Sequence, residues 1–107
     1  MPKFMFTGSY THDAVAAIRK GGGSPRKAAA QALATSLGGT LECLYFAFGE
    51  WDFIAIADLP DTVAAASLAS AIGESGSMSR FATTVLLTPA DMDAASRTSP
   101  TYSPPGT

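Results

Sequence analysis

The stretch that decides the fold is Leu41 to Asp58, LECLYFAFGEWDFIAIAD. It contains two apolar runs of strand length, separated by the turn-forming residues Gly49-Glu50-Trp51-Asp52. Glycine at position 49 suits the first central position of a two-residue type II′ turn, and a four-residue loop is the alternative. The middle of the chain is therefore predicted to be an antiparallel pair of strands joined by a tight turn.

The residues before this pair predict one strand and the start of a crossover. Lys3 to Tyr10 carries aromatic side chains on one face at the two-residue spacing of a strand. Thr11 is placed to cap a helix over residues 12–20, and the glycines at 21–23 end that helix. Ser24 is placed to cap a second helix, with proline at its first position, which extends to Leu37. The first crossover is thus expected to be a helix broken in two.

The residues after the pair repeat this plan. Pro60-Asp61 opens a helix that runs to about Ile72, and a polar loop over 73–79 follows it. Residues 80–88 read as a last strand, which Pro89 ends. The remainder is rich in serine, threonine and proline, a composition typical of chain without regular structure. We expect one domain over residues 1–93 and a tail over residues 94–107.

The order strand-helix-strand-strand-helix-strand predicts an α+β, ferredoxin-like fold with an antiparallel sheet of order 4-1-3-2. Its helices can cover only one face of the sheet. Yet Leu44 and Phe46 alternate with Cys43 and Tyr45, so both faces carry apolar side chains. A half-solvated antiparallel sheet alternates apolar and polar residues instead. The second face is therefore expected to be buried against another copy of this chain, and two such sheets would close an α/β barrel.

The composition excludes several classes of function. A net charge of −2 and a pI of about 5.1 argue against nucleic-acid binding. No apolar run reaches the length of a membrane span. One histidine and one cysteine cannot supply the common zinc ligand sets, so no metal site is expected. The lone cysteine and the lack of a signal-peptide pattern at the start favour a cytoplasmic protein.

Five stretches of the chain, read together, resemble the GYD domain family of the dimeric α/β-barrel superfamily. They are FTGSYT at 6–11, GGSPR at 22–26, SLGGTLECLYFAFGEWDF at 36–53, DLPD at 58–61 and TTVLLTP at 83–89. Trp51 stands where the family's tyrosine is expected, so an aromatic residue is kept. The resemblance implies the fold and no specific chemistry. Related dimeric barrels include cofactor-free monooxygenases, isomerases, cyclases and haem proteins, but a shared fold does not transfer an activity.

The predicted topology brings the end of the first strand, the hairpin turn and the start of the last strand to one end of the sheet. We expect a small-molecule site at this barrel mouth. The expected ligand-binding residues are Tyr10, His12, Trp51, Asp52 and Arg80. Alternatively, Trp51 plugs the barrel end and Asp52 bonds turn amides or pairs with Arg80.

Catalysis at this mouth would need a proton acceptor, and His12 and Asp52 are the candidates. Ser9 with His12 would form a nucleophile and base, but no oxyanion motif accompanies them. Haem ligation through His12 is a further alternative, although a lone histidine favours no cofactor. Ser24 and Arg26, in the loop GGGSPRK, are candidates for an anion site at a helix N-terminus; a solvated loop or a subunit contact is the alternative.

Three functions are consistent with these residues. The first is a homo-oligomeric α/β-barrel protein that binds a small, partly apolar molecule at the barrel mouth. The second is an enzyme of the same geometry, such as a cofactor-free oxygenase or isomerase. The third is a structural assembly module whose tail grips its neighbours. The partners expected are therefore a second copy of the chain and a small molecule, without nucleic acid or membrane.

Overall fold

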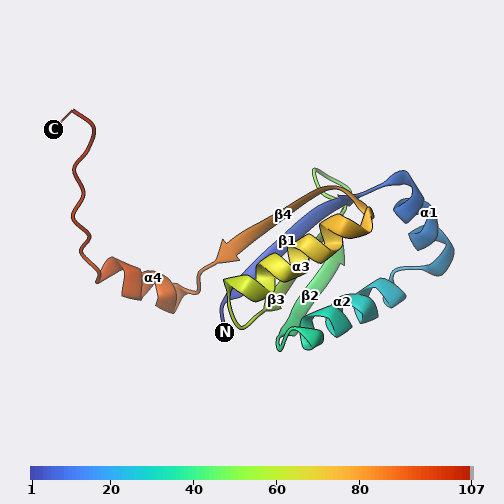
Figure 1. Ribbon diagram of the computed structural model, residues 1–107, viewed down its shortest axis with the longest axis horizontal. Helices are drawn as coiled ribbons and strands as arrows, with labels where there is room; N and C mark the ends of the chain where they lie inside the picture. Colours follow the sequence, from blue (N-terminus) through green and yellow to red (C-terminus); the bar gives the residue numbers. More distant parts are fainter. Residues whose placement is uncertain (107) are drawn as a thin grey trace.

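The computed structural model describes residues 1–106, which fold into four strands and four helices (Figure 1). In chain order these are β1 (Lys3–Tyr10), α1 (His12–Gly21), α2 (Ser24–Ser36), β2 (Thr40–Phe46), β3 (Phe53–Asp58), α3 (Thr62–Ser75), β4 (Met78–Leu86) and α4 (Pro89–Ser96). None of these helices has the length and apolar character needed to cross a membrane.

The four strands form one antiparallel sheet in the order β2-β3-β1-β4. This is the predicted order 4-1-3-2 read from the other edge, so the ferredoxin-like α+β fold is confirmed. β1 lies in the middle, where Phe4 is opposite Ala57 of β3 on one side and Val85 of β4 on the other. α2 packs along β2 and α3 along β4, and both helices cover the same face of the sheet (Figure 1).

The core lies between this face and the two helices. Phe4 and Phe6 are buried side by side, with ring centroids 6.4 Å apart. Phe53 is buried beside them on β3, and Gly8 makes room for it, because a Cβ at position 8 would come within 2.6 Å of the Phe53 ring. The remaining buried apolar side chains that complete this cluster are Ala55, Ala57, Leu59, Ala65 and Leu68. Ala65 and Leu68 form the face of α3 that packs on the sheet.

A β-bulge in β2 changes which of its side chains face the helices. Leu41 is opposite Ala57, but Cys43 is opposite Ile56, so Glu42 is the extra residue. Leu41 and Leu44, three positions apart, consequently point to the same side, toward the helices. The Glu42 carboxylate is paired with Lys3 at 2.9 Å, and Lys3 also bonds Asp58 at 2.9 Å.

The connection between β2 and β3 is the longer of the two predicted alternatives. The strands end at Phe46 and resume at Phe53, and the Ala47 amide donates to the Asp52 carbonyl over 2.8 Å. Residues 48–51 therefore form the loop. The two-residue type II′ turn is wrong, because Gly49 does not have the positive φ that this turn requires.

The helix ends confirm some predicted caps and correct others. The Thr11 hydroxyl accepts a hydrogen bond from the Ala14 amide at 3.4 Å, as expected for the cap of α1. Ser24 is the first residue of α2 rather than its cap, because Gly23 already has helical dihedral angles and its carbonyl accepts from the Lys27 amide. α3 extends one turn beyond the predicted Ile72, so the polar loop that follows it is short.

α4 was not predicted. The Thr88 side chain accepts from the Asp91 amide and the Asp91 carboxylate accepts from the Thr88 amide, which is a capping box, and Pro89 occupies the first turn. Pro89 therefore begins a helix after the strand. α4 stands away from the sheet and its two covering helices, and residues 97–106 extend beyond it without further helix or strand (Figure 1).

The sheet face opposite the helices is largely apolar, as the sequence analysis expected. One row across it joins Cys43, Ile56, Met5 and Thr84, and the next joins Tyr45, Ile54, Thr7 and Ala82. Tyr45 is 68% exposed, and no helix of the described chain covers these two rows. The polar group formed by Lys3, Asp58 and Glu42 lies beyond the first row.

Candidate functional site

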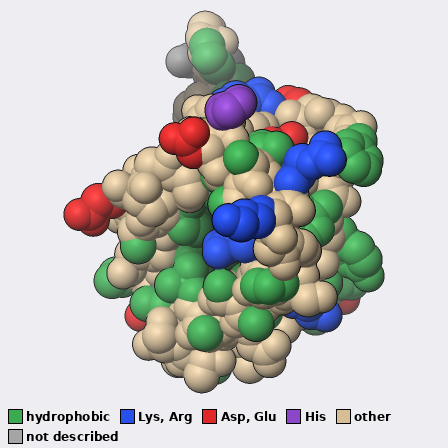
Figure 2. All heavy atoms as spheres, turned by 90° about the vertical axis from the view of Figure 1, so that its right-hand side faces the viewer, with side chains coloured by type: hydrophobic (Ala, Val, Ile, Leu, Met, Phe, Trp, Pro, Cys, Tyr) green, Lys and Arg blue, Asp and Glu red, His purple; other side chains and the backbone are tan. Residues whose placement is uncertain are grey.

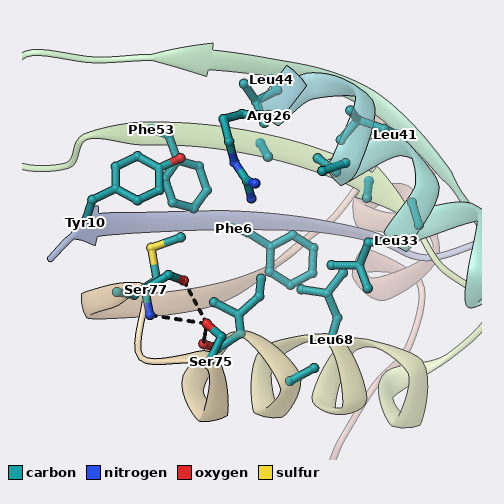
Figure 3. Close-up of a pocket in the computed structure, with 18 residues that line it drawn as sticks. Phe6, Tyr10, Arg26, Leu33, Leu41, Leu44, Phe53, Leu68, Ser75 and Ser77 are labelled. Atoms are coloured by element: carbon teal, nitrogen blue, oxygen red, sulfur yellow. Dashed lines mark hydrogen bonds between the residues drawn. The ribbon is translucent and has the colours of Figure 1, made fainter. Parts of the chain in front are cut away.

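A cavity of about 310 Å³ lies between the sheet and the two helices that cover it. Its floor consists of β-strand side chains, including Phe6, Phe53 and Ala55, and its walls come from α2 and α3 (Figure 3). The end of the molecule near α1 shows a hollow lined with apolar side chains, beside which basic side chains stand (Figure 2). The other lining residues are Tyr10, Arg26, Ala29, Ala30, Leu33, Ala34, Leu41, Leu44, Ala57, Leu68, Ala71, Ile72, Ser75, Ser77 and Met78.

Small side chains on the helices create this space. Ala29 and Ala30 of α2 and Ala71 of α3 line the cavity where larger residues would fill it. The alanine-rich compositions of both helices, SPRKAAAQALATS and TVAAASLASAIGES, were the sequence signal that could have located it. Strand ends were the expected place for chemistry, whereas this cavity is defined by missing side-chain volume on the helices.

Tyr10 is the predicted site residue that lines this cavity. Its ring lies beside that of Phe53, with centroids 5.4 Å apart, at one end of the space (Figure 3). Burial raises the pKa of the Tyr10 phenol above its ordinary value of 10.0, the charge of Arg26 acts in the opposite direction, and that of Asp52 adds to the increase. At neutral pH the phenol is therefore a neutral hydrogen-bond donor at the cavity wall.

Arg26 is the only charged side chain among the residues that line the cavity. It comes from the first turn of α2, and its guanidinium points between Tyr10 and Phe6 (Figure 3). Within residues 1–106 it has neither an ion-pair partner nor a hydrogen-bond acceptor. Ser24, the other candidate for the predicted anion site, does not line the cavity.

Ser75 and Ser77 form the polar part of the opposite wall. The hydroxyls of these two serines are 2.8 Å apart, and the Ser77 amide donates to Ser75 Oγ at 3.2 Å (Figure 3). The Ser77 carbonyl accepts from the Thr11 amide at 2.9 Å, which ties this segment to the start of α1. These groups bond one another, whereas neither the Arg26 guanidinium nor the Tyr10 hydroxyl has a hydrogen-bond partner within residues 1–106.

The predicted mouth residues lie at one end of the sheet, but they divide into separate contacts. Asp52 accepts a hydrogen bond from the Tyr10 amide at 2.9 Å. Trp51 and Arg80 form a second pair, with the guanidinium carbon 4.2 Å from the indole centroid. Arg80 also donates to the Glu50 carbonyl at 2.5 Å. Arg80 therefore binds the loop through Trp51 and Glu50 rather than through the Asp52 carboxylate.

His12 lies apart from these contacts. Its side chain is 97% exposed at the first position of α1, and its nearest charged neighbour is Asp13, at 3.6 Å. It lines neither the main cavity nor a second hollow of about 300 Å³ between α1 and the β2–β3 loop. Asp52 and Tyr10 line that second hollow, together with Val15, Ile18, Arg19, Phe46, Ala47 and Phe48. The ligand-binding and catalytic roles given to the mouth residues stay predictions.

Comparisons with known proteins support the resemblance found in the sequence. The model of the GYD domain matches residues 4–96, which includes the sheet apart from Lys3, both covering helices and α4. No curated protein and no solved structure matches the chain. Because the family model spans most of the 107 residues, the chain belongs to the GYD domain family.

Proposed function

We propose that this protein binds a small, partly apolar molecule in the cavity between its sheet and helices α2 and α3. The observation that carries the proposal is the cavity itself: about 310 Å³, walled by alanine, leucine and phenylalanine side chains, with few polar groups. Ligand sites commonly have this size and character. Well-packed cores of small domains leave few voids larger than a water molecule, so an apolar hollow of this size supports a binding role.

A neutral fluorescent probe of apolar sites, N-phenyl-1-naphthylamine, tests this proposal. Ala30→Phe places a ring in the cavity from α2 and should weaken probe binding at least tenfold. Ala32→Phe is the matched control, because Ala32 lies on the same helix, is exposed and does not line the cavity. Equal binding by both variants would show that the probe sits elsewhere and would contradict the proposal. If Ala30→Phe weakens probe binding and Ala32→Phe does not, native mass spectrometry of the purified protein is the next step, to identify a co-purified natural ligand.

Binding is preferred to catalysis because the expected proton acceptors do not line this cavity. His12 is exposed at the surface, and Asp52 is bonded to the Tyr10 amide. A cofactor-free oxygenase or isomerase remains the alternative. It would have to act in the second hollow, where Asp52 is a lining residue.

We further propose that the protein is a homodimer whose two sheets pack face to face. The face opposite the helices supports this, because two consecutive rows across it carry Cys43, Ile56, Met5, Ile54 and Ala82. A contiguous apolar surface of this kind is rare on a soluble monomer. The structural-module hypothesis shares this interface, requires no ligand and adds contacts between the C-terminal tail and neighbouring copies.

Light scattering of the full chain tests the dimer. We expect twice the chain mass of 11.0 kDa. Ile54→Glu places a charge in the middle of the proposed interface and should produce monomers. Val63→Glu is the control, because Val63 is 74% exposed on α3, on the other side of the sheet. A wild-type protein of 11.0 kDa, or an Ile54→Glu dimer, would refute this arrangement.

A further inference from the structure

We infer that the ligand of the sheet–helix cavity is a singly ionised carboxylic acid whose carboxylate pairs with Arg26 and whose apolar body lies over Phe6 and Phe53. This inference rests on the proposed binding function and specifies its ligand. It begins from the guanidinium of Arg26, which points into an otherwise apolar space and lacks a partner within residues 1–106 (Figure 3). Arg26 is exposed to solvent beside these apolar walls, so it can hold an anionic head group at the rim while the apolar body of the ligand lies inside the cavity.

The position of Arg26 in its helix supports a role outside helix stability. It lies in the first turn of α2, where the helix dipole favours acidic side chains and opposes a cation. No acidic residue occupies that turn, and no carboxylate of the described chain approaches Arg26. Its neighbour Lys27 does not line the cavity. Arg26 is therefore the single cationic side chain among the described residues that line the cavity.

The number of charges selects the class of anion. The described lining contains one cation and no anion, so a monoanion matches its charge, whereas the second negative charge of a phosphate monoester would find no further cation among the lining residues. The planar guanidinium fork matches the two oxygens of a carboxylate. The neutral phenol of Tyr10, next to the guanidinium, is placed to donate to the same group.

The apolar lining of the cavity beyond Arg26 indicates the chemical character of the ligand's body. Beyond Arg26 the walls are aliphatic and aromatic, from Phe6 and Leu44 on the sheet to Leu33 and Leu68 on the helices. The two serines near its rim are bonded to each other and leave little capacity for a second polar group. A compact aromatic or branched aliphatic monocarboxylate fits these walls better than a sugar or a nucleotide.

The experiment compares two probes of equal shape, 1-naphthoate and 1-naphthalenemethanol, by isothermal titration calorimetry. We expect the full-length protein to bind the carboxylate at least tenfold more tightly than the alcohol at neutral pH. Arg26→Gln should remove most of that preference, because the affinity for the carboxylate falls at least tenfold while the affinity for the alcohol changes much less. Lys27→Gln, one residue along the same helix, should leave both affinities unchanged.

The remaining outcomes distinguish a failure of the carboxylate inference from a failure of the proposed binding function. Equal affinities of the wild-type protein for the two probes would overturn the carboxylate inference and leave the apolar cavity standing. An equal loss of preference in Arg26→Gln and Lys27→Gln would overturn the role of Arg26, because the effect would then come from general surface charge. If neither probe binds and N-phenyl-1-naphthylamine does not bind either, the proposed function itself fails.

Discussion

The Asp52 carboxylate accepts a hydrogen bond from the Tyr10 backbone amide at 2.9 Å, which joins the β2–β3 loop to the last residue of β1. A second bond, from the Asp52 amide to the Gly8 carbonyl at 2.8 Å, reinforces the same junction. The loop is therefore fixed to the central strand at the end of the sheet where Tyr10 borders the cavity.

Asp52→Ala should destabilise the protein by about 1–3 kcal/mol, because the Tyr10 amide loses its charged acceptor in a half-buried position. Urea unfolding followed by circular dichroism measures the change. Glu50→Ala is the control, since Glu50 is exposed in the same loop and only its backbone carbonyl is bonded, to Arg80. Equal stability of the two variants would show that the carboxylate of Asp52 contributes nothing to the junction.

Gly39→Ala and Gly73→Ala should change stability in opposite directions. A Cβ at Gly39 would collide with the Asp58 carbonyl and crowd the buried Leu59, so a loss of about 1–3 kcal/mol is expected. A Cβ at Gly73, within α3, meets nothing within 4 Å, and alanine there should add about 0.5–1 kcal/mol. Thermal and urea unfolding of both variants give the comparison. A neutral Gly39→Ala would mean that β2 and β3 can separate at this point without cost.

The raised pKa of Tyr10 makes a prediction for alkaline pH. The folded protein holds the phenolic proton more tightly than the unfolded chain, whose ordinary pKa is 10.0. The stabilisation is therefore complete below pH 10.0 and is lost as the pH rises through the higher pKa of the folded state. The pKa of Lys3 is also raised, mainly by its hydrogen bond to Asp58. The stabilisation that Lys3 contributes is therefore lost as the pH rises through its folded-state pKa as well.

Tyr10→Phe should therefore reduce the loss of stability above pH 10.0, while Lys3 continues to contribute part of it. Unfolding in urea at a series of pH values is the measurement. Tyr102→Phe is the matched control, because Tyr102 is 73% exposed in the C-terminal segment. The prediction is refuted if both tyrosine variants follow the wild-type pH profile.

Leu68→Ala tests the packing of α3 on the sheet. The Leu68 side chain is 5% exposed within the core and also lines the cavity, so its loss should cost about 2–5 kcal/mol. The cost should fall toward the lower end of that range if the existing cavity lets neighbouring side chains relax. Val63→Ala, at an exposed position of the same helix, should change stability by less than about 0.5 kcal/mol. Denaturant midpoints measured side by side decide between these values.

The sequence was sufficient to predict the sheet. Strand and helix periodicities, together with the handedness of crossovers, determined an order that the structure confirms. The bulge at Glu42 was not predictable, because it follows from pairing of β2 with β3 and from ion pairing with Lys3, which are both long-range. α4 was missed for a different reason: its Thr88–Asp91 capping box was visible, but Pro89 was read only as the end of a strand.

The candidate site was predictable only in part. Strand topology brought Tyr10, Trp51, Asp52 and Arg80 to one end of the sheet, yet it could not tell which of them would contact each other. Arg26 was marked as an anion-binding candidate from its helix position alone. What the sequence could not supply was the direction of its side chain, which depends on how α2 crosses the sheet beside β2.

The bulges bear on how this sheet can meet other molecules. Each edge strand has one near its start: Glu42 is the extra residue in β2, and Ser79 is the extra residue in β4, between Met78 and Arg80. Each irregularity adjoins or contains a charged side chain, and irregular, charged edges resist the addition of a further strand. Both edges of the sheet are thereby protected from edge-to-edge growth and aggregation. The proposed association of two copies would therefore use the broad apolar face.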